Sequence, residues 1–133
     1  MTNEDPPEST PLPGAEVHPS IADEVIHRMH LVFRDKNKDI DAIVPTACVL
    51  KGATESPNAL DKSDFLRLKE VYFYSEKDQS LRESSPKDIR KYYKNKNPWE
   101  YIDACVFDKS MTWCIGLTHH GYITYTESER VPE

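Results

Sequence analysis

The sequence lacks any hydrophobic run of the roughly 20 residues that a membrane-spanning helix needs. It has only four glycines among 133 residues, and none of them forms the glycine-rich loop of a nucleotide-binding site. The segment that starts at Met1 shows neither a basic nor an apolar region, so we expect no secretory signal. Lys and Arg number 17 against 23 Asp and Glu, giving a net charge of -6. Nucleic-acid binding, which needs a basic surface, is therefore disfavoured.

Cysteine is also scarce. Cys48, Cys105 and Cys114 form an odd-numbered set without a CxxC motif, which argues against a disulfide scaffold and against a structural zinc site. We therefore expect a reduced protein of the cytoplasm that needs no cofactor, no metal and no membrane.

The N-terminal segment has a composition of its own. Residues 1–19 hold half of the ten prolines, several acids and no Lys or Arg. Such a segment buries too little apolar surface to offset the entropy lost on ordering. We predict that residues 1–19 form a flexible acidic arm and that residues 20–133 form a single α+β domain.

Two helices are expected. Ser20, with Asp23 three residues later, resembles a helix start, and the apolar residues that follow lie on one helical face. Ser85, Pro86 and Asp88 place a cap, a first-turn proline and a first-turn acid at the start of a second helix. The predicted buried face of the first helix comprises Ala22, Val25, Ile26, Met29, Val32 and Phe33.

The region between the helices is less regular. Residues 42–50 are apolar but contain Pro45, which favours an edge strand or an irregular extended segment. Residues 51–63 have the composition of a loop. Residues 66–74 fit a short helix capped by Ser63, followed by a strand over residues 71–74, where valine and aromatic residues concentrate.

Residues 101–127 predict a three-stranded antiparallel meander. If Val106 faces Trp113 and Ala104 faces Ile115 across a turn at residues 109–110, every apolar pair falls on one face. A second turn at residues 119–121 places glycine at the left-handed position of a three-residue hairpin, and Leu117 then faces Ile123. The predicted fold class is therefore α+β, with helices packed on an antiparallel sheet that ends in this meander.

The other face of the meander mixes aromatic, polar and acidic side chains, so it is either half covered by another element or a binding surface. In the predicted register Cys105 faces Cys114, and we interpret the two as packed thiols rather than a redox pair. The paired histidines His119 and His120 fit a polar turn better than a catalytic acid or base.

Two charged groups have ordinary explanations. Asp23, His27 and His30 share one side of the first helix and could seed a metal site, although a solvated helix face is the commoner arrangement. A basic run complements the dipole at the end of the second helix without any need for nucleic acid. This run consists of Lys87, Arg90, Lys91, Lys94 and Lys96.

Outside that run the chain is strongly acidic and carries seven tyrosines and two tryptophans. Acids that steer encounter and aromatic side chains that anchor it suit an interface with a basic protein. An ordinary acidic surface would have the same composition.

A short stretch near the C-terminus resembles a known family. The segment from Trp99 to Asp108, followed by Trp113-Cys-Ile-Gly-Leu-Thr-His119, is similar to a hairpin of small bacterial immunity-type proteins, which neutralise a toxin. The similarity covers about 20 residues and supplies no catalytic residue. It implies a cytosolic single-domain inhibitor encoded beside its toxin.

Our hypothesis is a non-enzymatic binding protein, an immunity protein or inhibitor that occludes a basic toxin such as a nuclease. The expected partner-binding residues are Tyr101, Asp103, Asp108, His119 and Tyr122. The alternatives are a small α+β nuclease that uses a hairpin histidine, with Glu100 or Glu127 and a basic residue of the second helix, and a structural adaptor subunit. The net charge argues against the nuclease.

Overall fold

The computed structural model describes residues 10–33, 53–97, 100, 102–118 and 121–128. Within these residues the chain forms one seven-stranded sheet in the order β1-β4-β3-β5-β6-β7-β2, and every neighbouring pair is antiparallel. The α+β fold class is confirmed. The strands are β1 (Ala15–Glu16), β2 (Thr54–Glu55), β3 (Val71–Ser75), β4 (Ser80–Ser84), β5 (Ala104–Phe107), β6 (Trp113–Leu117) and β7 (Ile123–Glu127); the helices are α1 (Pro19–Phe33), the 3-10 helix η2 (Ala59–Asp61), α2 (Ser63–Leu66) and α3 (Pro86–Asn95).

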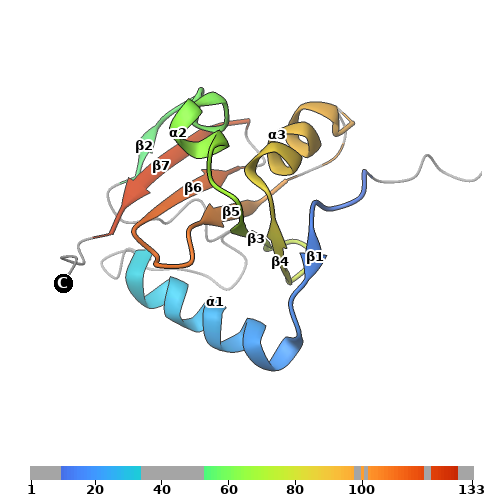
Figure 1. The fold of residues 1–133 in the computed structure, drawn as a ribbon, viewed down its shortest axis with the longest axis vertical. Coiled ribbons are helices and arrows are strands. Elements are labelled where there is room, and N and C mark those ends of the chain that lie inside the picture. The colour runs from blue at the N-terminus through green and yellow to red at the C-terminus, as the bar shows by residue number, and fades with distance from the viewer. Residues whose placement is uncertain (1–9, 34–52, 98–99, 101, 119–120, 129–133) are drawn as a thin grey trace, which may run out of the picture.

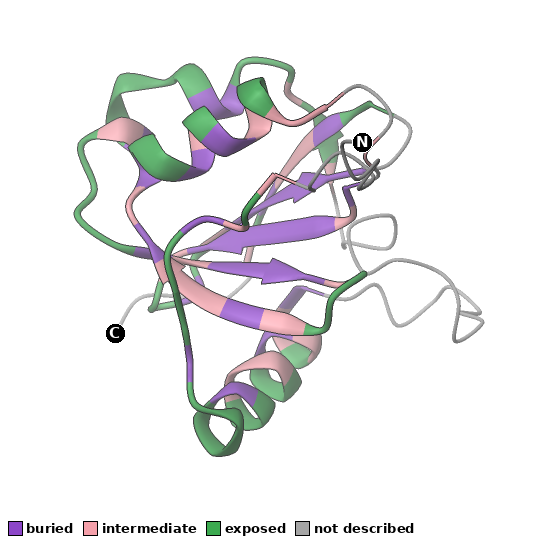
Figure 2. Cartoon of the chain, turned by 90° about the vertical axis from the view of Figure 1, so that its right-hand side faces the viewer, coloured by how far each residue is buried: buried purple, intermediate pink, exposed green. Residues whose placement is uncertain are grey.

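Helices cover both faces of the sheet, with α1 on one side and α2 and α3 on the other (Figures 1 and 2). Successive residues of a strand point to opposite faces. Phe73 and Val106 therefore join the cluster beneath α2, η2 and α3, whereas Tyr74 and Cys105 join the cluster beneath α1.

Helix α1 begins two residues earlier than predicted, because Ser20 was expected to be the cap that precedes the first helical residue. Pro19 occupies the first helical position, where its missing N–H costs nothing. His18 Nδ1 lies 2.8 Å from Ser20 Oγ and accepts the Ser20 N–H at 3.2 Å, so His18 caps the helix in place of Ser20. Ala22, Met29 and Phe33 are buried, which confirms the predicted apolar face.

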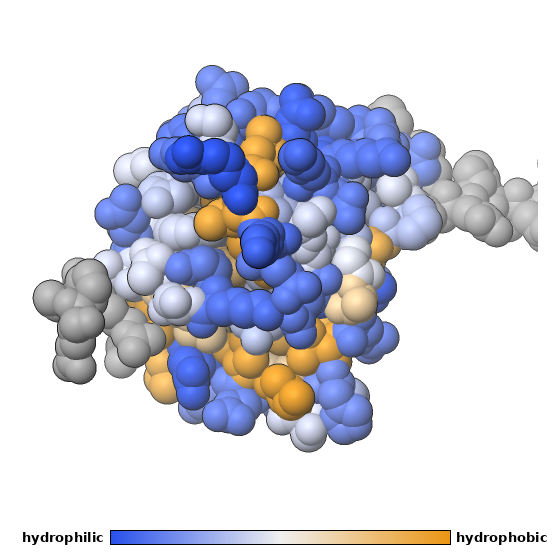
Figure 3. Space-filling model, viewed as in Figure 1, coloured by the Kyte–Doolittle hydropathy of each residue, from blue (hydrophilic) through white to orange (hydrophobic). Residues whose placement is uncertain are grey.

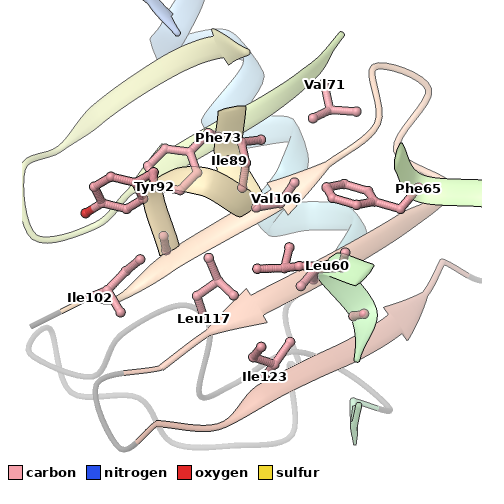
Figure 4. Packing of buried hydrophobic residues seen from close by; sticks show 13 residues of the cluster. Leu60, Phe65, Val71, Phe73, Ile89, Tyr92, Ile102, Val106, Leu117 and Ile123 are labelled. Atoms are coloured by element: carbon pink, nitrogen blue, oxygen red, sulfur yellow. The ribbon is translucent and has the colours of Figure 1, made fainter. Parts of the chain in front are cut away.

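Helix α3 starts as predicted. The Ser85 hydroxyl accepts the Asp88 N–H at 3.2 Å, and Pro86 is the first helical residue. Ile89 and Tyr92 face the sheet, and the Tyr92 ring meets the Phe73 ring edge-on at 5.6 Å (Figure 4).

The stretch between residues 51 and 84 holds more structure than predicted. The split into a short helix and a following strand is confirmed by α2 and β3. Ser63 is the first residue of α2 rather than its cap, and no side chain caps this helix. The expected loop at residues 51–63 is interrupted by β2 and η2, and strand β4 has no counterpart among the sequence predictions.

The meander is confirmed, but one of its two registers is wrong. Leu117 faces Ile123 as predicted, and Gly121 has a φ of +86° at the turn. In the first hairpin Val106 faces Ile115 and Ala104 faces Leu117, two residues away from the predicted register. A two-residue shift leaves every side chain on the same face, so the hydrophobic pattern fits both registers equally well.

Part of the expected arm lies along the sheet. Among residues 10–18, β1 pairs with β4 and Val17 is buried. Residues 1–9 and the predicted extended segment at residues 42–50 lie outside the described residues. Within the described part of the chain, no helix is long and apolar enough to cross a membrane.

Candidate partner-binding site at one end of the sheet

The sequence left two alternatives for the second face of the meander, a covered face or a binding surface. In the structure this face is covered. Cys105, Phe107 and Cys114 are all buried in the cluster beneath α1. Of the two alternatives, the structure supports a face covered by another element. A binding surface must therefore lie at the ends of the strands, at the edges of the sheet or on the outer faces of the helices.

The strand register defines two ends of the sheet. Ser75, Ala104, Leu117 and Ile123 are linked in register through neighbouring strands, so the chain just beyond each of them lies at the same end. We call this the Asp103 end. It comprises the turn at residues 76–79, the segment at residues 102–103 and the described parts of the turn at residues 118–122. Tyr101 and His119, two of the predicted site residues, lie outside the described residues.

Tyr122 is the most exposed aromatic side chain at this end, with 54% of its surface accessible. Its backbone is held firmly, because the Tyr122 N–H donates to the Thr118 hydroxyl at 3.1 Å and the Tyr122 carbonyl accepts the Thr118 N–H at 3.0 Å. Nothing lies within 4 Å of a Cβ added at Gly121. The turn therefore requires glycine at this position for its positive φ and not for lack of space. The turn therefore presents an exposed tyrosine from a fixed backbone.

Carboxylates surround this end. The Asp103 carbonyl accepts the Glu76 N–H at 2.8 Å, which joins the turn at residues 76–79 to the start of β5. Burial, together with the charges of Glu100 and Asp78, raises the pKa of Tyr92 to about 12. Burial and the Glu76 carboxylate likewise raise the pKa of Tyr74. These acids lie close enough to the two tyrosines to make the local potential negative.

Hydrogen bonds keep the carboxylate of Glu100 ionised. Burial disfavours its charge, but hydrogen bonds from Thr10 and Asn97 outweigh burial and hold the pKa of Glu100 below its usual value. The Thr10 N–H lies 3.0 Å from Oε1 and the Thr10 hydroxyl 2.8 Å from the same oxygen. This carboxylate therefore anchors the N-terminal segment.

Asp108 lies at the opposite end of the sheet and has a structural role. Its carboxylate accepts the N–H groups of Thr112 at 2.7 Å and Trp113 at 3.2 Å, as well as the Thr112 hydroxyl. Asp108 thus caps the turn between β5 and β6. The predicted site is therefore divided, because the structure brings Asp103 and Tyr122 to one end and places Asp108 at the other.

The predicted facing of the two cysteines is wrong. Cys105 faces Gly116, whereas Cys114 faces Phe107, so the two thiols are not directly opposite each other. Both are buried. In the described residues no three side chains of His, Cys, Asp or Glu form a group that could hold a metal, and this includes Asp23, His27 and His30 of α1.

The basic run on α3 is partly neutralised. Arg90 Nε and Lys94 Nζ lie 2.7 and 2.9 Å from the same oxygen of Asp61. Their hydrogen bonds hold the pKa of Asp61 below its usual value. Lys96 lies 5.6 Å from the centre of the Tyr93 ring. The two contacts with Asp61 fasten α3 to η2.

The nuclease alternative receives no support from the described geometry. His119 and His120 lie outside the described residues, but Thr118 and Gly121 on either side belong to the Asp103 end. Glu127 faces Trp113, which places it at the Asp108 end. Arg90 and Lys94 are engaged with Asp61. Of the two carboxylates considered for that mechanism, Glu127 therefore lies at the opposite end from the turn at residues 118–122, and Glu100 accepts hydrogen bonds from Thr10.

Comparisons with known proteins find no counterpart. No family model, no curated protein and no solved structure matches the chain.

Proposed function

We propose that this chain is a non-enzymatic binding protein that inhibits a basic protein partner by docking its Asp103 end against it. The observation that carries the proposal is Tyr122, an exposed aromatic side chain on a turn whose backbone Thr118 holds in place. Exposed tyrosines that lose little freedom on binding are frequent anchors of protein interfaces. The resemblance to immunity-type proteins suggests a toxin as the partner and the cytoplasm as the site of action.

Charge supports the same choice of partner. The whole chain carries a net charge of -6. Glu76 acts on Tyr74, Glu100 and Asp78 act on Tyr92, and Asp103 lies beside Glu76 in the same part of the molecule. A negative surface accelerates encounter with a positive one, and salt weakens this effect. The expected partner therefore presents Lys and Arg around an apolar recess that accepts a tyrosine ring.

The test is capture of the partner with matched variants. Tagged protein is incubated with lysate of its own source, and a stoichiometric, salt-sensitive basic protein is identified by mass spectrometry. Tyr122→Ala should weaken its binding about tenfold or more, as expected for an anchor residue. Asp103→Lys should slow association, and its effect should shrink at high salt.

The controls are chosen from the far surfaces. Leu31→Ala removes an apolar side chain of similar exposure, 56%, from α1, and Glu127→Lys reverses a charge at the Asp108 end. Both should bind as the unaltered protein does. The proposal fails if Tyr122→Ala and Asp103→Lys bind as tightly as these two controls.

A further inference from the structure

The N-terminal segment contacts the body of the protein as a bound peptide would. We call residues 10–17 the strap; it follows the outer edge of β4 and ends at α1 (Figure 1). The Val17 N–H donates to the Leu81 carbonyl at 2.9 Å, and β1 pairs with Arg82 and Glu83 of β4. At the other end of the strap the Thr10 N–H donates to Glu100.

Arg82 forms hydrogen bonds with the backbone of the strap. Its Nε donates to the Pro13 carbonyl at 3.0 Å, and one of its terminal nitrogens donates to the Gly14 carbonyl at 2.9 Å. Two adjacent carbonyls thus share one guanidinium. Main-chain pairing with an edge strand, supplemented by a few side-chain contacts, is how many domains recognise extended peptides.

Gly14 is the position that the edge selects most strictly. Its φ is +80°, and a Cβ added there would lie 2.1 Å from the Glu83 carbonyl oxygen and 2.7 Å from the Ser84 Cβ. Both of these atoms belong to residues of β4, which the sheet fixes in place. Any side chain at this position therefore prevents the strap from binding along the edge of β4.

Hydrogen bonds hold the strap more than apolar burial does. Pro13 and Val17 are its buried residues, and Leu12 is partly buried. Both residues of β1 are exposed (Figure 2). The strap can therefore detach without opening the two hydrophobic clusters, apart from the contact that Val17 makes in the cluster beneath α1 and the contact that Leu12 makes with the cluster beneath α3.

We propose that the outer edge of β4, with Arg82 and Glu100, is a peptide-binding site that the chain fills with its own strap and that also accepts the strap of a second copy. The second copy is the fitting occupant because the site requires three features in fixed order. These are a hydroxyl for Glu100, two adjacent carbonyls for Arg82 and a glycine against β4, and residues 10–14 supply all three.

The connection to α1 favours exchange between copies. Only His18 separates the strap from Pro19 at the start of α1. Short connections of this kind are common hinges for the exchange of an element between identical chains. In the exchanged dimer each copy completes the sheet edge of the other with an identical set of contacts.

The test uses the full chain with Gly14→Ala, which unseats the strap and leaves the site vacant. A fluorescent peptide of residues 10–18 is titrated against this variant, and its anisotropy gives the Kd. We expect binding at least about tenfold tighter than that of the same peptide carrying Gly14→Ala. The unaltered chain should bind the peptide more weakly than the variant, because its own strap competes. Adding Arg82→Ala to the variant should also weaken binding.

Hydrogen exchange at Leu81 and Glu83 identifies whether the edge is open. Rapid exchange there without peptide binding overturns the proposal, as does equal binding of the two peptides. If the variant does not fold, copies of the unaltered chain with two different tags are mixed at high concentration, warmed and cooled. Native mass spectrometry should then show mixed dimers, and their absence overturns the proposal.

Discussion

Substitution of Met29 by alanine tests whether α1 is a full structural layer. Met29 lies in the C-terminal half of α1 and is completely buried in the cluster that includes Leu81, Phe107 and Cys114. Few other residues of this helix are fully buried, so the covered face of the sheet depends on a narrow stripe. Figure 3 shows that hydrophobic surface gathers around this helix at the lower edge of the molecule.

The expected loss follows from the burial of the side chain. Removing a buried Met side chain sacrifices its transfer free energy and leaves a cavity, which together cost about 2–5 kcal/mol. Because Met29 is 0% exposed, we expect about 3 kcal/mol, equivalent to a fall in Tm of about 10 °C. The matched control is Leu31→Ala, two residues further along the helix and 56% exposed, which should change the free energy of unfolding by no more than about 0.5 kcal/mol.

Urea unfolding followed by circular dichroism measures both variants. The midpoint should fall for Met29→Ala with the slope unchanged, which indicates a change in stability alone. A loss below about 1 kcal/mol for Met29→Ala, or an equal loss for the Leu31→Ala control, would refute the assignment of α1 as a packed layer.

Three further outcomes follow from local geometry. Gln79 has a φ of +50° and is exposed, so Gln79→Gly should raise the free energy of unfolding by about 0.5–1 kcal/mol; a lower midpoint in urea would contradict this. Ser85→Ala removes the cap that accepts the Asp88 N–H and should cost about 1 kcal/mol in the same assay, whereas Ser85→Asp should retain most of the stability. Lys109 Nζ lies 2.7 Å from both Glu70 and Glu83, and the hydrogen bond that it donates lowers the pKa of Glu70. A carboxyl group whose pKa is lowered in the folded state stabilises the fold at pH values above its unfolded-state pKa, and this stabilisation is lost as pH falls through the folded-state pKa. Lys109→Met should therefore lower Tm at pH 7, and lower it by less near pH 3. A fall in Tm that is independent of pH would contradict the assignment.

The sequence was most informative where local chemistry determines conformation. The start of α3 follows from Ser85, Pro86 and Asp88, which act within one helical turn. The hairpin between β6 and β7 follows from Gly121, whose positive φ fixes the turn. In both cases the relevant contacts join residues close together in the chain.

Other features depend on partners that the local sequence does not reveal. Strand β4 has one buried apolar residue, Leu81, and exists because it pairs with β3 and β1. The turn before β6 contains Met111 at a φ of +56°, a conformation that methionine rarely adopts, and this turn shifted the first hairpin by two residues. The role of Asp108 was missed for the same reason, because its contacts with Thr112 and Trp113 depend on the conformation of that turn.

The order of the strands also sets the order in which the chain can fold during synthesis. Strands β1 and β2 form the two edges, but their partners are β4 and β7, which leave the ribosome much later. Strands β3 to β7 pair mostly with close neighbours in sequence, so the centre of the sheet forms from the C-terminal half. The apolar face of α1 emerges early and must wait for that sheet. Contacts between such distant segments form slowly, and a nascent chain that exposes this face in the meantime is a natural client for chaperones.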